Sequence, residues 1–113
     1  MLELVCSKKE DGILVIGLKG ELNSTSCNSF NNDIRRINDG EPCNIVLDFS
    51  NLTYLSSAGL RSLILIFKSL STSNKKLIIL NPSSLVNEVL RVSGFVKLIP
   101  ICKTFEEVKD LIK

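Results

Sequence analysis

Two adjacent serines, Ser56 and Ser57, are the side chains whose type and position could do chemistry in this sequence. They stand between an apolar segment that ends at Leu55 and the small residues Ala58-Gly59, which open a long apolar run. A serine acts as a nucleophile beside a general base, and histidine, the commonest such base, is absent from the chain. A serine can also cap a helix or receive a phosphoryl group from another protein. The pair therefore favours capping or modification over catalysis.

No other motif points to a catalytic, cofactor or metal site. The chain contains no G-x-x-x-x-G-K-[ST] loop and no G-x-G-x-x-G after a strand. Its cysteines show no C-x-x-C spacing, which argues against zinc, and we expect reduced and mostly buried thiols rather than a disulfide. We therefore predict a protein that is not an enzyme and that needs no cofactor or metal. The four cysteines are Cys6, Cys27, Cys43 and Cys102.

Length and composition predict one soluble domain that spans residues 1–113. Hydrophobic residues make up 44% of the chain and charged residues 23%, as in ordinary globular domains. The net charge of +2 is small, and basic pairs such as Lys8-Lys9 and Lys75-Lys76 are scattered, so no nucleic-acid footprint is expected. No apolar run approaches the roughly 20 residues that span a bilayer, and Glu3 interrupts the only apolar start. We therefore expect a cytoplasmic protein without membrane insertion.

The apolar pattern predicts strands and helices that alternate along most of the chain. Asp11-Gly12 indicates a hairpin between the first two strands, and Gly20 is expected to end the second one. The segment 38–42 predicts a helix stop and a turn. The expected strands are 2–6, 13–18, 44–49, 76–80 and a short one near 97–101, and the expected helices are 24–38, 57–71, one from Asn81-Pro82-Ser83 to Gly94, and one from 105.

The spacing of apolar residues predicts which helix faces are buried. Within 24–38 the polar residues Asn31–Asp33 and Arg35 are expected to face water. Thr104 and Glu107 have the spacing of a capping box for the last helix. The expected buried residues are Cys27, Phe30, Ile34 and Ile37 in the first helix, Leu60, Leu63, Ile64, Phe67 and Leu70 in the second, Leu85, Val89, Leu90 and Val92 in the third, and Phe105, Val108, Leu111 and Ile112 in the last.

A hairpin followed by alternating helices and strands predicts an α/β fold, with a mixed sheet of four to five strands and about four helices packed on it. The nearly unbroken apolar run at 44–49 suits a central strand that is covered on both faces. Ser56 and Ser57 then lie past the carboxyl end of that strand, at the amino end of a helix. Functional sites gather at this edge, and the helix end favours an anion. The simpler alternative is a helix cap, for which one serine is enough.

The segment "LDFSNLTYLSSAGLRSLILIFKSL" resembles the signature of the anti-sigma factor antagonists, which are members of the STAS domain family. In that family a strand ending in Asp-hydrophobic-Ser leads through a turn to Asp-Ser-[Ser/Ala]-Gly-Leu. Asp48-Phe49-Ser50 fits the first part, and Ser57-Ala58-Gly59-Leu60 fits the second. "GILVIGLKGELN" and "LIILNPSSLVNEVLRVSGFVKLIPICKTFEEV" are similar to other segments of the family in the right order. The resemblance covers nearly the whole chain.

The resemblance implies a regulatory cycle. The unmodified protein would bind an anti-sigma factor that is also a serine kinase, phosphorylation would separate the two, and a phosphoserine phosphatase would reset the switch. By motif position the acceptor is Ser57, with Ser56 as the second candidate. The partner-binding surface would be formed by Asn23, Ser24, Thr25, Ser56, Ser57, Ala58, Gly59, Arg61 and Ser62.

Two departures from the family pattern keep other functions open. The family usually has Asp where this chain has Ser56 and Asn23. Their loss favours, as an alternative, a STAS binding module that is not phosphorylated and belongs to a transporter complex or a signalling scaffold. A nucleotide-consuming enzyme is a third and weakly supported hypothesis.

The polar residues of this region also have simpler interpretations. Asp48 is expected to bond a neighbouring loop, and the turn at 23–25 to cap the first helix. Thr53 and Ser62 are expected to be surface or capping hydroxyls.

Overall fold

The computed structural model describes residues 2–10, 12–38 and 43–112, which form one five-stranded sheet with helices packed on it. The strands lie in sequence order, and β1 pairs with β2 antiparallel whereas every other pair is parallel. This arrangement confirms the predicted mixed sheet with four α-helices. The elements are β1 (Leu2–Glu10), β2 (Ile13–Leu22), α1 (Cys27–Ile37), β3 (Asn44–Leu55), α2 (Ser57–Thr72), β4 (Leu77–Leu80), α3 (Ser84–Val92), the 3-10 turn η1 (Phe95–Lys97), β5 (Ile101–Cys102) and α4 (Phe105–Ile112).

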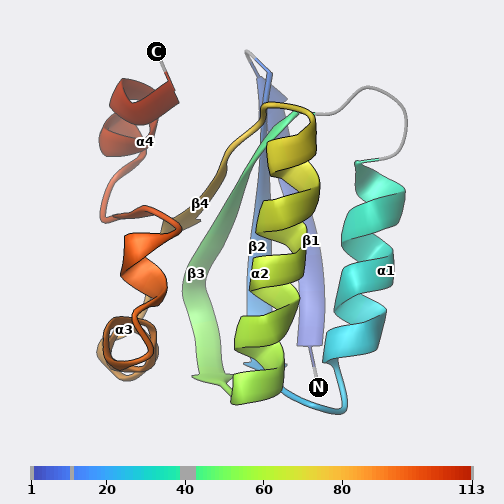
Figure 1. Ribbon diagram of the computed structural model, residues 1–113, viewed down its shortest axis with the longest axis vertical. Helices are drawn as coiled ribbons and strands as arrows, with labels where there is room; N and C mark the ends of the chain where they lie inside the picture. Colours follow the sequence, from blue (N-terminus) through green and yellow to red (C-terminus); the bar gives the residue numbers. More distant parts are fainter. Residues whose placement is uncertain (1, 11, 39–42, 113) are drawn as a thin grey trace.

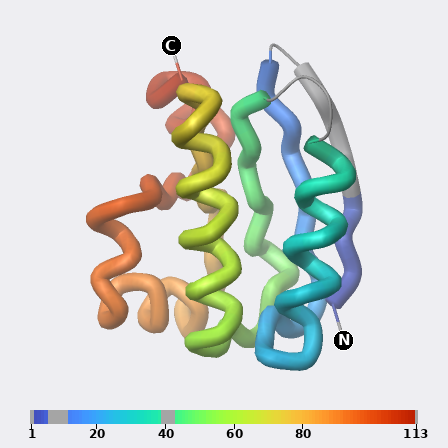
Figure 2. The backbone as a smooth tube through the Cα atoms, turned by 45° about the vertical axis from the view of Figure 1, so that its right-hand side comes forward, coloured from blue at the N-terminus to red at the C-terminus, as the bar shows by residue number. Residues whose placement is uncertain are grey.

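The helices cover the two faces of the sheet unequally (Figure 1). α1 and α2 lie side by side on one face, and α3 packs through Val86 and Leu90 into the same core cluster. The opposite face carries a smaller cluster, in which Val108 of α4 packs with Val46 and Ile78 of the sheet. The tube in Figure 2 shows the chain passing from β2 into α1 at the same end of the molecule at which α2 begins. That end of the sheet carries the serine pair.

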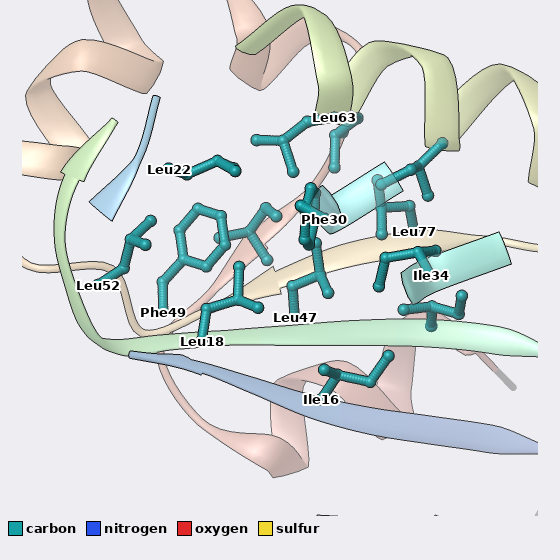
Figure 3. Packing of buried hydrophobic residues seen from close by; sticks show 14 of the residues in the cluster. Ile16, Leu18, Leu22, Phe30, Ile34, Leu47, Phe49, Leu52, Leu63 and Leu77 are labelled. Carbon is teal, nitrogen blue, oxygen red and sulfur yellow. The ribbon is translucent and has the colours of Figure 1, made fainter. Parts of the chain in front are cut away.

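The main core lies between the sheet and the α1–α2 pair (Figure 3). Phe30 from α1 and Leu63 from α2 are fully buried against Phe49 of β3 and its neighbours. Each such side chain contributes roughly 1.5–3 kcal/mol by leaving water. This packing fixes both helices on the sheet, and with them the loops at their amino ends.

Strands β2 and β3 are longer than the sequence pattern predicts. The expectation that Gly20 ends the second strand is wrong, because β2 continues to Leu22. β3 continues to Leu55, and its pairing with β2 shifts register between Asp48 and Asn51. After Phe49 the nearly unbroken apolar run gives way to the polar residues Ser50 and Asn51, which is why the sequence pattern predicts an end at 49. The prolonged strands carry the chain directly to the serine pair.

The third helix exposes two residues that were expected to be buried. Leu85 and Val92 are 63% and 72% exposed, whereas Val86 and Leu90 face the core. The region near 97–101 is also corrected, since it holds η1 and only a two-residue strand, β5.

The remaining boundaries and caps agree in part with the sequence pattern. α1 begins at Cys27 instead of 24. In α4, Leu111 is 39% exposed, and Thr104 accepts a hydrogen bond from the amide of Glu107 as a cap should. Gly12 has the left-handed conformation (φ 76°) of a hairpin turn. Asp11 and residues 39–42 lie outside the described residues.

The thiols that the structure describes are free. Cys43 and Cys102 are buried, and Cys27 is partly buried. The side chain of Cys6 lies outside the described part of the chain.

Candidate functional site

Ser56 is the N-cap of α2. Its backbone is extended (φ −94°, ψ 174°), and its Oγ accepts a hydrogen bond from the amide of Gly59 at 3.2 Å. Its own amide donates to the carbonyl oxygen of Leu22 at 3.0 Å. The hydroxyl and the amide of Ser56 are therefore committed to starting the helix and to holding it against the end of β2.

Ser57 is the first residue of α2, and its side chain is exposed. Across the described residues, its hydroxyl has no hydrogen-bond partner. The pair thus divides the two roles that the sequence left open: one serine caps the helix, and the other presents a free hydroxyl to solvent. Histidine, the commonest general base, is absent from the chain.

Gly59 allows α2 to approach β2 closely. A Cβ added at this position would lie 2.7 Å from the carbonyl oxygen of Leu22 and 2.8 Å from Cδ1 of Leu55. Neither distance is tolerable for a carbon atom, so any larger residue would force the helix away from the sheet. Gly59 itself is buried, and its role is to position the site rather than to contact a partner.

The turn between β2 and α1 is organised by Asn23. The Oδ1 atom of Asn23 accepts hydrogen bonds from the amides of Thr25 and Ser26 at 3.0 and 3.2 Å, and from the Thr25 hydroxyl at 2.7 Å. Its amide donates to the Oγ of Ser26 at 3.0 Å. The turn was expected to cap α1, but the N-cap position is Ser26, whose side chain makes no capping bond to that helix. Asn23 instead shapes the loop itself.

The turn and the serine pair lie beside each other. Leu22 is paired with Leu55 in the parallel register of β2 and β3, and the bond from Ser56 to Leu22 closes the gap between the loops. Figures 1 and 2 both place the β2–α1 connection next to the first turn of α2. The structure therefore brings together two segments that are more than thirty residues apart in the sequence.

Asn23 and Ser56 both act as hydrogen-bond acceptors through neutral oxygens. Each accepts from backbone amides, a role that a carboxylate oxygen could also perform. The neutral residues therefore preserve the local scaffold while removing negative charge. The first turn of α2 contains no acidic residue either.

Asp48 connects β3 to the loop that follows β4. Its Oδ1 accepts from the amide and hydroxyl of Ser50 at 3.0 and 2.6 Å, and Asn81 Nδ2 donates to the Ser50 Oγ at 3.1 Å. Asp48 was expected to bond a neighbouring loop, but it reaches that loop only through Ser50 of its own strand, and β3 does not end at Asp48. Thr53 is exposed as expected, and its hydroxyl donates to the carbonyl oxygen of Gly20 at 2.9 Å.

Ser62 is not a surface hydroxyl, and that prediction is wrong. It is only 3% exposed, and its Oγ donates to the carbonyl oxygen of Ala58 and accepts from Asn31 Nδ2 at 3.3 Å. Asn31, which was expected to face water, turns toward α2 and has a buried Oδ1 without a partner among the described residues. Ser62 therefore serves the α1–α2 contact, and the sequence showed no sign of this pairing.

We call five exposed residues from the turn after β2, the end of β3 and the start of α2 the serine surface, and Ser57 itself is one of them. Tyr54 is a member that the sequence reasoning missed; it is 47% exposed and comes three residues before Ser57. Tyr54 is the one aromatic residue in the segment between Ser50 and the serine pair, and this position could have marked it as a surface contact residue. Arg61 supplies the only charge. The serine surface consists of Ser24, Thr25, Tyr54, Ser57 and Arg61, whereas Ala58 is partly buried beside it.

The described residues offer no metal-binding cluster of three or more Cys, Asp or Glu side chains. Within the same ranges, none of the helices combines the length and the apolar character required to cross a membrane.

Comparison with known proteins shows the family to which the chain belongs. A sequence profile described as the STAS domain matches residues 6–110. Among curated proteins, the chain is 33% identical to BtrV of Bordetella bronchiseptica over 98 residues, which cover 87% of this chain and 84% of that protein. BtrV is named as a candidate anti-sigma factor antagonist.

Two solved structures show the same fold. A candidate anti-sigma factor antagonist from Thermotoga maritima, TM1081, superposes with a TM-score of 0.82 at 24% identity, over 91% of this chain and 89% of that one. The phosphorylated form of SpoIIAA, described as a Bacillus cell fate determinant, gives a TM-score of 0.71 at 24% identity, over 98% and 100% of the two chains. At this level of identity the two likenesses show the fold.

Proposed function

Because this chain belongs to the STAS domain family, we propose that it acts as an anti-sigma factor antagonist that is switched off by phosphorylation of Ser57. The observation that carries the proposal is the division of roles at the start of α2. Ser56 is committed to the helix cap, while the Ser57 hydroxyl is exposed and unbonded. The name of the relative BtrV supports the same class of function.

In the unmodified state, the serine surface binds an anti-sigma factor that also carries serine kinase activity. Binding presents the Ser57 Oγ to ATP held by the kinase. The Oγ attacks the γ-phosphorus, the bond from that phosphorus to the ADP oxygen breaks, and the hydroxyl proton passes to a base of the kinase. This chain contributes the acceptor and its position, and the partner contributes the catalytic groups.

Phosphorylation ends the interaction through charge and size. A phosphate adds about −1.5 to −2 charges and three acceptor oxygens to a surface that previously held a hydroxyl. The amino end of α2 tolerates this anion because its dipole and free amides favour it. The partner surface, which packed against a neutral group, does not. A phosphatase restores the hydroxyl by hydrolysis, so the domain switches without refolding.

Incubation with the cognate kinase and ATP, followed by site mapping with mass spectrometry, tests the proposal. Ser57→Ala should abolish the modification and keep binding, and Ser57→Asp should weaken binding. Ser56→Ala is the matched control, and it should leave the modification in place. The assignment of the acceptor would be overturned if Ser57→Ala were still phosphorylated. It would also be overturned if Ser56→Ala lost the phosphate while Ser57→Ala kept it.

The neutral residues at 23 and 56 favour a second candidate function. Without the carboxylates usual in the family, the same surface could bind a partner that never phosphorylates it, in a transporter complex or a signalling scaffold. Affinity capture from the native host with mass spectrometry separates the two. A kinase-type anti-sigma factor supports the first function, and recovery of a transporter or scaffold subunit with unmodified Ser57 supports the second.

A further inference from the structure

Ser57 and Arg61 share one exposed face of α2. They are four positions apart, which places their side chains one above the other on a helix. Both are exposed, whereas Gly59 and Ser62 between and beside them are buried. Lys68 is also exposed, and it lies about 16 Å further along the helix axis from Ser57, on nearly the same face.

Among the residues that the structure describes, Arg61 has no ionic partner. The ion pairs among the described residues are Asp33–Arg36 and Glu88–Arg91, each within another helix. No acidic side chain lies in the first turn of α2. The residues at 23 and 56 are neutral acceptors, so they give the guanidinium no counter-charge. The cation is therefore free to pair with a partner or with a new anion.

We propose that Arg61 is the internal counter-charge of phosphorylated Ser57, an inference that rests on the phosphorylation proposed above. An anion followed by a cation four residues later is the favourable order on a helix, because it also agrees with the helix dipole. A guanidinium can further donate two parallel hydrogen bonds to phosphate oxygens. Modification then acts twice: it adds an anion to the serine surface, and it withdraws Arg61 from the partner.

This pairing explains how the switch works without the usual carboxylates. In their absence Arg61 is the one charge of the serine surface itself, while the exposed Glu21 is paired with Tyr54 at the end of β2. A partner surface that carries a carboxylate opposite Arg61 suits this arrangement. After phosphorylation the guanidinium is engaged within its own helix, and the carboxylate of the partner faces the phosphate instead. The same residue therefore favours binding before modification and stabilises the released form after it.

The test uses the full chain with phosphoserine inserted at position 57 by an expanded genetic code, so it requires no kinase. Three such proteins are compared: the otherwise unchanged chain, Arg61→Gln, and the control Lys68→Gln, which removes the same charge far from the phosphate. Phosphorus-31 NMR follows the second ionisation of the phosphate as the pH is varied. We expect the pKa to be at least about 0.2 units higher in Arg61→Gln than in the unchanged chain. The difference should vanish near 1 M salt, where screening acts within about 3 Å.

Equal phosphate pKa values in the unchanged chain and in Arg61→Gln would overturn the inference. So would an equal rise in Lys68→Gln, since that result would reflect net charge and not a pair. Because phosphoserine is supplied during synthesis, these outcomes do not depend on a kinase. A kinase that leaves Ser57 unmodified would refute the proposed function, whereas absence of the pKa difference would refute only the role of Arg61.

Discussion

The carbonyl oxygen of Leu22 accepts a hydrogen bond from the amide of Ser56 at 3.0 Å, and this bond joins the end of β2 to the start of α2. The same oxygen lies against Gly59, where an added Cβ would be only 2.7 Å away. The carbonyl group of Leu22 thus limits how closely the start of α2 approaches the sheet. Through it, the turn at 23–26 and the free hydroxyl of Ser57 become parts of one surface.

Gly59→Ala should destabilise the protein by about 1–3 kcal/mol, because the new methyl group overlaps backbone that cannot move freely. The helix propensity of alanine, about 1 kcal/mol better than that of glycine, would by itself predict the opposite sign. Urea denaturation measures the change. Ser69→Ala, an exposed substitution in the same helix, is the control and should stay within about 0.5 kcal/mol. A Gly59→Ala protein as stable as this control would contradict the close approach.

Ser56→Ala should lower the free energy of unfolding by about 1 kcal/mol, since it removes the acceptor for the amide of Gly59. Ser57→Ala should change it by less than about 0.5 kcal/mol, since its hydroxyl bonds to nothing among the described residues. Thermal and urea denaturation of the two variants provide the comparison. If Ser57→Ala proved the more damaging of the two, the assignment of cap and free hydroxyl would be reversed.

Asn23→Ala should cost about 1 kcal/mol, because two amides and one hydroxyl of the turn lose their acceptor. Asn23→Asp keeps an oxygen in the same place and should stay within about 0.5 kcal/mol of the natural protein. Denaturation curves for the pair show whether position 23 serves the scaffold. A loss in Asn23→Asp as large as in Asn23→Ala would mean that the amide nitrogen, and not the oxygen, is needed.

Tyr54→Ala should weaken binding to the proposed anti-sigma factor about tenfold or more, because an aromatic side chain at the centre of a contact commonly acts as an anchor. The protein should remain folded, since Tyr54 is 47% exposed. Titration calorimetry measures the affinity. Leu111→Ala changes an exposed apolar residue of α4, which lies toward the opposite end of the molecule in Figure 1, and should leave binding unaffected. Unchanged affinity in Tyr54→Ala would show that Tyr54 does not contact the partner.

Burial, with a smaller effect of Glu107, raises the pKa of the Cys102 thiol. The folded protein therefore holds this proton more tightly than the unfolded chain does. Its contribution to stability is complete below the ordinary thiol pKa of about 8.5 and is lost as the pH rises through the folded value. The urea midpoint should thus decrease when the pH is raised from about 7 to about 10. This decrease should be larger in the natural protein than in Cys102→Ala. An equal fall in both would show that this thiol does not contribute.

The order of strands and helices, and the place of the serine pair within it, could be read from the sequence alone. Apolar runs and helical spacing are local properties, and they identified the four α-helices and the first four strands with errors at their ends, but not η1 or the true extent of β5. The motif from Ser57 to Leu60 identified the family and the candidate acceptor for the same reason, since its residues are consecutive. Local patterns could not reveal that β3 continues to Leu55, because the shift in register depends on its pairing with β2.

Only the tertiary structure decided which serine caps α2 and which remains free. The cap position depends on the carbonyl group of Leu22, more than thirty residues away in the sequence. It also depends on Gly59, whose missing side chain lets this carbonyl lie close to the helix. Ser62 is buried for a similar reason, because Asn31 of α1 reaches across to it. Leu85 and Val92 are exposed because the face of α3 that meets the sheet is set by Val86 and Leu90. Hydrogen bonds and contacts between distant segments determine which side chains are bonded, buried or exposed. The sequence of a single segment does not specify these contacts.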